Sequence, residues 1–153
     1  MALGSVSLTG ADIININGRI FKDLADGDCV NLEFPNNLVE AKTGKNGNTI
    51  FAFNATGQLV TVTVRLIRGS ADDKFLNNQL SIYRQDPARF VLFDGEFTKR
   101  AGDGQGSVTD DVYKVGAGLV QKIPATKENQ EGDTEQAVSV YQLVFANTDR
   151  LLT

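Results

Sequence analysis

The clearest pattern along the chain is a strict alternation of apolar and polar side chains over residues 59–68. A period of two residues is typical of a strand with one buried face. The same alternation over residues 30–34 predicts a second strand. Because a turn-like stretch around Gly57 precedes the first of these strands, we expect residues 49–54 and 59–68 to form a hairpin.

Other apolar runs predict further strands. Residues 13–21 form a broken run around Gly18, which suggests a first strand and its turn, and residues 88–97 and 112–123 resemble long strands kinked by glycines. Residues 137–145 are apolar at nearly every position, which is typical of a strand covered on both faces. One face of that strand is expected to meet the core, and the other a neighbouring subunit.

Only residues 71–85 have a helical pattern. Ser70 is a suitable N-cap, acidic residues occupy the first turn, and apolar side chains follow at intervals of three and four. Pro87 ends the helix because the residue before a proline disfavours the α conformation. About seven strands and one helix predict a mainly β fold. We expect a single domain over residues 1–153, an antiparallel sandwich or barrel with one flanking helix.

Two polar stretches lack a core pattern. Residues 35–48 are predicted to be a long loop between strands, and residues 125–135 a second, acidic one. Both are longer than usual hairpin loops, which favours a functional role.

Composition excludes much chemistry. The 153 residues contain no histidine and a single cysteine, Cys29, so histidine-dependent catalysis, a cysteine zinc site and an intramolecular disulfide are excluded. The formal net charge of -4 also argues against a dedicated nucleic-acid binder. We therefore expect a structural or binding protein that is not an enzyme.

Possible ligand motifs are incomplete. Gly44-Lys45 lacks the flanking residues of a phosphate-binding loop, and the glycines at 102, 104 and 106 lack a dinucleotide-binding context. The glycines instead predict a hairpin tip between residues 97 and 112. The aspartates at 23, 26 and 28 lack the order of a calcium loop. No cofactor and no metal are expected.

The start of the chain resembles no signal peptide, and no stretch reaches the length of about 18 apolar residues that a membrane span needs. The sequence predicts a soluble protein made in a cytoplasm, with no membrane insertion.

The order of elements resembles a known family. A short apolar start precedes a strand (DCVNLEF) and a polar loop (AKTGKNGNTIFAFNATG), then an alternating strand (QLVTVTVRLIRGS), one helix (ADDKFLNNQLSIYRQ) and a final strand (VSVYQLVFANTDRLL). This pattern is similar to the tail tube proteins of contractile-tailed bacteriophages. It covers nearly the whole chain and contains no single diagnostic motif. Type VI secretion tubes and long non-contractile tails share the architecture.

The resemblance implies a structural virion protein. Six subunits would form a ring, rings would stack into a hollow tube around an inner β-barrel, and DNA would pass through the bore without being held. Expected partners are other copies of the chain and the tail sheath, tape-measure, baseplate initiator and tail terminator proteins. The resemblance places the protein in the virion tail, assembled in the cytoplasm of a bacterial host.

Two sets of residues are assigned as hypotheses. The loop at 35–48 is the candidate contact between stacked rings, and deleting residues 42–48 is expected to leave a folded subunit that no longer stacks. Its proposed contact residues are Leu38, Val39, Glu40, Lys42, Lys45, Asn46 and Asn48. Polar strand positions are the candidates for the bore lining, because basic side chains would retard DNA. These positions are Asn31, Glu33, Asp94 and Glu96.

Two other functions stay open at this point. One is a ring protein of a type VI-like injection machine, or another tail-completion ring. The other is a small β-barrel module that binds a ligand, which the absence of tryptophan and the presence of only three tyrosines make less favoured.

Overall fold

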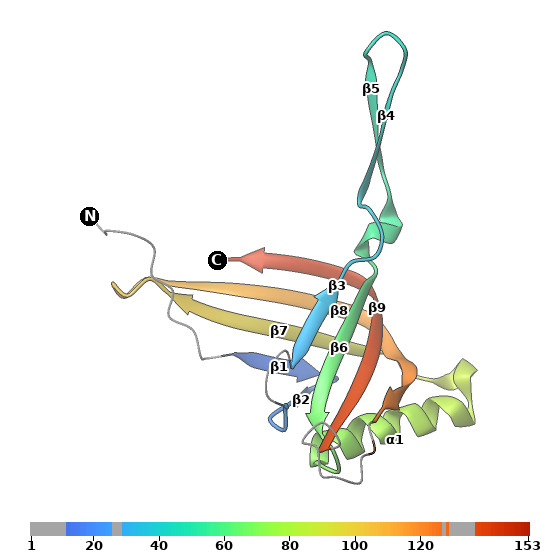
Figure 1. The fold of residues 1–153 in the computed structure, drawn as a ribbon, viewed down its shortest axis with the longest axis vertical. Coiled ribbons are helices and arrows are strands. Elements are labelled where there is room, and N and C mark those ends of the chain that lie inside the picture. The colour runs from blue at the N-terminus through green and yellow to red at the C-terminus, as the bar shows by residue number, and fades with distance from the viewer. Residues whose placement is uncertain (1–11, 26–28, 127, 129–136) are drawn as a thin grey trace.

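The computed structural model describes residues 12–25, 29–126, 128 and 137–153. In this part of the chain, seven strands form one antiparallel sheet, two form a separate hairpin, and there is one α-helix (Figure 1). The predicted architecture is confirmed. The elements are β1 (Ile13–Ile16), β2 (Arg19–Ile20), β3 (Val30–Glu33), β4 (Val39–Thr43), β5 (Thr49–Phe53), η1 (Ala55–Gln58), β6 (Val60–Ile67), α1 (Ala71–Gln85), η2 (Pro87–Arg89), β7 (Phe93–Gly102), β8 (Val108–Ala125) and β9 (Val138–Leu152).

The large sheet has the order β2-β1-β7-β8-β9-β6-β3 and folds over on itself. The two long strands, β8 and β9, each run through both halves of this folded sheet. Residues 119–125 of β8 and 138–145 of β9 join β6 and β3 in what we call the first layer. The remaining parts of β8 and β9 join β7, β1 and β2 in the second layer. In Figure 1 the first layer crosses in front of the second.

The hydrophobic core lies between the two layers. Along β6 the alternate apolar positions from Val60 to Leu66 are fully buried, while the intervening residues are only half-buried and Ile67 at the end is exposed. The predicted alternation of this strand is confirmed. Buried side chains of β9 and β7 complete the core, and α1 contributes Leu76 and Leu80. The largest of the fully buried side chains are Tyr141, Phe93 and Phe145.

The two long strands change layer at a corner that requires small residues. Ala117 adopts a left-handed conformation with φ of 55°. A side-chain carbon at Gly118 would overlap the ring of Phe145, which is fully buried. The glycine therefore lets the Phe145 ring lie against the backbone of β8 where the sheet bends.

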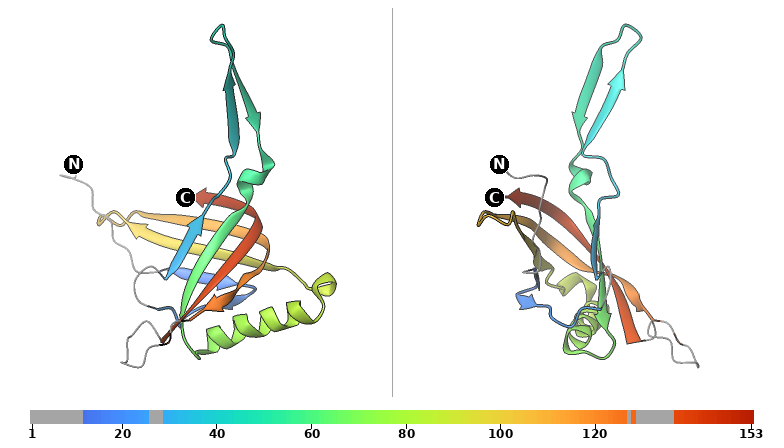
Figure 2. Two further views of the ribbon diagram at one scale, coloured as in Figure 1. Left: turned by 45° about the vertical axis from the view of Figure 1, so that its right-hand side comes forward. Right: turned by 60° about the vertical axis from the view of Figure 1, so that its left-hand side comes forward.

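Helix α1 occupies the predicted range, residues 71–85. The Ser70 side chain accepts a hydrogen bond from the amide of Asp73 at 3.3 Å, as an N-cap should. The buried Leu76 and Leu80 face the core, which fixes the helix across one end of the two layers (Figure 2).

The first turn of α1 is attached to the sheet through two acidic residues. The buried carboxylate of Asp72 accepts hydrogen bonds from the Arg19 guanidinium at 2.7 Å and from two backbone amides at 2.9 Å each. Asp73 accepts from the Tyr141 hydroxyl at 2.5 Å and from the Ser139 hydroxyl at 3.1 Å. The polar groups that the helix buries are thus hydrogen-bonded, as burial requires.

For residues 35–54 the expected strand at 49–54 is confirmed, but its predicted pairing was wrong, and residues 39–43 form a strand where a loop was expected. β5 pairs with β4, and not with β6, in a two-stranded hairpin that we call the arm, residues 39–53. Its turn is closed by the Gly44 amide, which donates to the Asn48 carbonyl at 2.7 Å, and Gly47 adopts a φ of 85°. The expected turn at 54–57 is instead the short helix η1. Figures 1 and 2 show the arm projecting from the body.

Other strand limits also differ from the expectation. Residues 88–92 are not part of a strand, because Pro87 begins the short helix η2 and β7 starts only at Phe93. The expected hairpin tip between β7 and β8 is confirmed. Gly104 and Gly106 have φ of 83° and 93° there, and Asp103 accepts hydrogen bonds from the Gln105 and Ser107 amides.

Candidate assembly surfaces

The arm carries large apolar side chains that are mostly exposed. Ile50, Phe51 and Phe53 expose 69%, 72% and 68% of their surface, and Leu38 and Val39 expose 48% each. A two-stranded hairpin is at best marginally stable alone in water. Strand register places Phe51 and Phe53 together with Val39 on one face and Ile50 on the other. Exposed apolar surface like that of the first face marks an interaction site. The arm therefore has the chemistry of a docking element.

The structure gathers all of the residues assigned to ring stacking on or beside the arm. Leu38 precedes β4, three of them lie on β4, and Lys45, Asn46 and Asn48 lie in the turn. Strand register places Val39 opposite Phe53. Sequence reasoning missed Phe51 and Phe53 because it assigned their strand to the body. The Asn46-Gly47 pair, a strong hairpin signal, could have revealed them.

The base of the arm is fixed to the body. The Asn54 amide donates to the Leu38 carbonyl at 2.7 Å, and a side chain on Gly57 would overlap the backbone of Leu38. A groove of about 520 Å³ lies beside this base. Its lining includes Phe34, Leu38, Phe53, Tyr113, Thr148 and Arg150. The apolar face of the arm thus continues onto the body.

The first layer has a free strand edge on each side. Among the described residues, β3 pairs only with β6, and residues 119–125 of β8 pair only with β9. The Cys29 carbonyl accepts a hydrogen bond from the Arg65 amide at 2.7 Å. Because backbone groups of successive strand residues point to opposite sides, the amides and carbonyls of Val30 and Leu32 point away from β6. Unpaired edges of this kind can pair with another strand.

The four residues assigned to the bore lie on two separate surfaces. Asn31 and Glu33 are exposed on β3, on the outer face of the first layer. Asp94 and Glu96 are exposed on β7, on the outer face of the second layer. Because the core lies between the layers, these outer faces point in opposite directions, and the two pairs do not come together.

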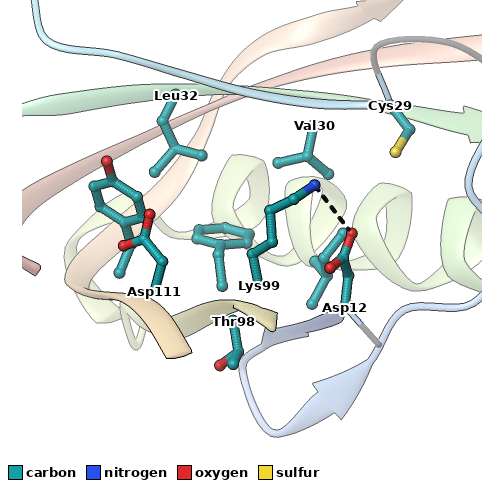
Figure 3. Close-up of a pocket in the computed structure, with 10 residues that line it drawn as sticks. Asp12, Cys29, Val30, Leu32, Thr98, Lys99 and Asp111 are labelled. Atoms are coloured by element: carbon teal, nitrogen blue, oxygen red, sulfur yellow. Dashed lines mark ion pairs between the residues drawn. The ribbon is translucent and has the colours of Figure 1, made fainter. Parts of the chain in front are cut away.

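A cleft of about 400 Å³ opens between β3 and the second layer (Figure 3). Its apolar lining consists of Ile14, Val30, Leu32, Phe97 and Tyr113. Lys99 reaches Asp12 at its mouth, with an Nζ–Oδ2 distance of 3.6 Å. Cys29 also lines it and is half-buried. Asp111 lies at the same mouth and accepts two hydrogen bonds from Arg150, at 2.9 and 2.8 Å, which lower its pKa.

The described residues offer no cluster of three or more metal-ligating side chains, and none of their helices is long and apolar enough to cross a membrane. Asp26 and Asp28 lie outside the described residues. In the second polar stretch, residues 127 and 129–135 also lie outside them, and Glu128 pairs with Arg68 at 2.6 Å.

No family model matches the chain, and no curated protein matches its sequence. A comparison with solved structures finds similarity to the PVC sheath/tube terminator of an extracellular contractile injection system, determined in the extended state. The TM-score is 0.56 at 8% sequence identity, and the match covers 93% of this chain and 92% of that chain. The chain therefore shares the fold of a tail component of a contractile injection system.

Proposed function

We propose that the protein is the structural subunit of a phage-like tail tube. Copies of the chain assemble into closed rings, and the rings stack into a hollow tube through which DNA passes. The observation that carries this proposal is the pair of free edges on opposite sides of the first layer. The shared fold with a contractile-injection-system tail component supports it.

Ring closure follows from the direction of the strands. Each neighbouring pair in the first layer is antiparallel, so β3 runs opposite to residues 119–125 of β8. Placing β3 of one copy beside this part of β8 in the next copy continues the antiparallel sheet. Pro124 has no amide to donate, so the pairing uses residues 119–123. Such a head-to-tail contact closes into a ring when the rotation is complete.

Stacking is assigned to the arm. Its apolar side chains need a partner, and the arm extends well beyond the body, so it can reach a subunit of the adjacent ring (Figure 2). The residues Glu40, Lys42 and Lys45 then form polar contacts around the apolar centre, an arrangement common at protein interfaces.

The bore is assigned to the outer face of the first layer, because that layer forms the continuous barrel and its inner face is the core. Asn31 and Glu33 then line the bore, and Asp94 and Glu96 lie on the opposite surface. Register adds further side chains to this face, both polar and aliphatic. They are Thr61, Thr63, Arg65, Lys122, Val140, Gln142 and Val144. The charges are of both signs, so the face offers DNA no continuous basic track.

The protein acts without catalysis in this proposal. Its partners are further copies of the chain, a sheath, a tape-measure protein, a baseplate initiator and a tail terminator, and it resides in the tail of the particle after assembly in the bacterial cytoplasm.

A second candidate function is a terminator that caps the tube with one ring. It is favoured by the name of the structural neighbour, which is a sheath/tube terminator. Both functions require ring closure, and they differ in whether rings stack repeatedly on one another.

Electron microscopy of the purified protein at rising concentration tests both. Open-ended hollow tubes that lengthen with concentration are the expected result. Single rings that never stack, even on preformed tube fragments, would support the terminator. A monomer that persists at high concentration and also in the presence of tube fragments would contradict both functions.

A further inference from the structure

The corner between α1 and β7 presents an exposed apolar protrusion, which we call the knob: Ile82, Val91 and Leu92. Val91 exposes 82% of its surface, and Ile82 and Leu92 expose 44% each. Within the described residues, the two later positions belong to no helix or strand. Aliphatic side chains this exposed on a short connection gain free energy when a partner covers them.

The knob has a rigid support. The Phe90 ring packs edge-on against Tyr83 of α1, with centroids 5.4 Å apart, and against the buried Phe93, at 5.8 Å. Phe93 in turn contacts Phe145 at the centre of the core. This chain of aromatic contacts holds residues 91 and 92 in place, so little conformational entropy is lost when they bind.

The cleft described above has matching chemistry. Its volume of about 400 Å³ is large enough for a few aliphatic side chains, and its lining is mainly apolar. In Figure 3, Val30 and Leu32 point into it from β3. No other segment of the described chain fills it.

Charges beside the two surfaces are complementary. Arg84 and Arg89 flank the knob, and the side chain of Arg89 is 89% exposed and pairs with Asp86 at 3.4 Å. This one contact leaves the guanidinium with further donors for a second carboxylate. Asp12 and Asp111 lie at the mouth of the cleft. Each carboxylate already has one basic partner, but a carboxylate has room to accept hydrogen bonds from a second guanidinium.

The knob and the cleft lie on opposite flanks of the molecule. In Figure 1, β3 lies to the left of β6 and β9 and the free part of β8 lies to their right, with the start of β1 further left and η2 further right. The proposed pairing of β3 with β8 of the next copy would therefore bring one flank against the other. The knob of one copy then approaches the cleft of its neighbour, behind the shared sheet.

We infer that the knob docks into the cleft of an adjacent copy and forms the outer half of the ring contact. This inference rests on the proposed ring assembly and adds a second, side-chain interface to the strand pairing. A contact between different surfaces of identical chains is heterologous, so it repeats around the ring until the ring closes.

The first test is Val91→Asp, with Asn77→Asp as a control of equal charge, because Asn77 is exposed and does not share the helix face of Ile82. Because Val91 is exposed in the subunit, the variant should fold like the wild type, as circular dichroism checks. Ring formation should need at least about tenfold more protein, since a charge replaces a buried aliphatic contact. The control should assemble like the wild type.

The second test uses the native thiol in the cleft. Val91→Cys should cross-link to Cys29 of the neighbouring copy through a short bismaleimide, giving a ladder of covalent oligomers that disappears when Cys29→Ser is added. Ile50→Cys on the arm is the comparison. Cross-linking of Cys29 from position 50, and none from position 91, would show that the arm occupies the cleft and would overturn the inference.

These tests distinguish the loss of the knob contact from the absence of ring assembly. If the wild type forms rings and Val91→Asp forms them at the same concentration, the docking of the knob is excluded and the ring assembly stands. If the wild type forms no rings under any of these conditions, the proposed function itself is contradicted, and the inference with it.

Discussion

Gly118 lies at the bend of the long strands, where the Phe145 ring leaves no room for a side chain. We predict that Gly118→Ala lowers the free energy of unfolding by about 1–3 kcal/mol, because the added carbon overlaps the buried ring of Phe145. Urea denaturation measures the change. Gly44→Ala is the control: its added carbon would lie 3.7 Å from the Asn48 carbonyl oxygen, an ordinary contact. Equal stability of the Gly118 variant and the wild type would contradict the prediction.

Asp72 makes the attachment of α1 depend on pH. Burial alone would raise the pKa of its carboxyl, but hydrogen bonds from the Asp23 amide, the Arg19 guanidinium and the Lys22 amide together lower it below the usual 3.8. A group whose pKa is lowered by folding stabilises the protein above its unfolded pKa, and this contribution is lost as the pH falls through the folded pKa.

The consequence is tested with Asp72→Asn. At pH 7 the variant should be less stable than the wild type by about 1–3 kcal/mol, since charged hydrogen bonds to buried donors are weakened. The difference should shrink as the pH falls below about 4, where the wild-type carboxyl also becomes protonated. Denaturation curves between pH 2 and 7 measure it, with the exposed Glu40→Gln as control. A difference that does not change with pH would exclude the ionic origin.

At the scale of elements, we predict that the arm can be removed without a loss of stability in the rest of the subunit. Because Leu38 and Asn54 are hydrogen-bonded to each other, a short Gly-Ser linker can replace residues 39–53. The variant should unfold at the same urea concentration as the wild type, because the residues of β4 and β5 are all exposed. It should form rings that do not stack, as electron microscopy would show. Tubes of normal length would exclude the arm as the axial contact.

The sequence predicted those elements whose pattern reflects the subunit's own core. β6 alternates because one face is buried in this chain, and α1 has its cap and its apolar stripe for the same reason. The first strand of the arm was taken for a loop, and its second strand was paired with β6, because no core imposes a pattern on them: the residues of both strands are exposed. In the proposed tube these apolar residues contact another subunit, which a single sequence does not contain.

The candidate site was predicted in part for the same physical reason. The residues assigned to stacking were chosen by the length of a polar stretch, which ended before Phe51 and Phe53. The polar positions on β3 and β7 were identified as outward-facing from their alternation, and both are exposed. Alternation defines a face within one strand only. It contains no information on which layer the strand joins, and so the two pairs were grouped together.

At the scale of the whole molecule, the two outer faces would form the inside and the outside of the proposed tube. If the first layer surrounds the bore, Glu33 is inside and Glu96 is outside. Cysteines at these positions can be compared in a Cys29→Ser background, which leaves each variant with one thiol. Both side chains are exposed in the subunit, so both should react with a small maleimide-biotin reagent.

Streptavidin then distinguishes the two surfaces after assembly. We predict that it decorates Glu96→Cys tubes along their whole length, because the outer face of the second layer is accessible from solution. Glu33→Cys tubes should bind it only at their open ends, because a protein of that size does not diffuse freely along a narrow bore. Electron micrographs of labelled tubes provide the measurement. Uniform decoration of Glu33→Cys tubes would place the first layer on the outside and would assign the bore to Asp94 and Glu96 instead.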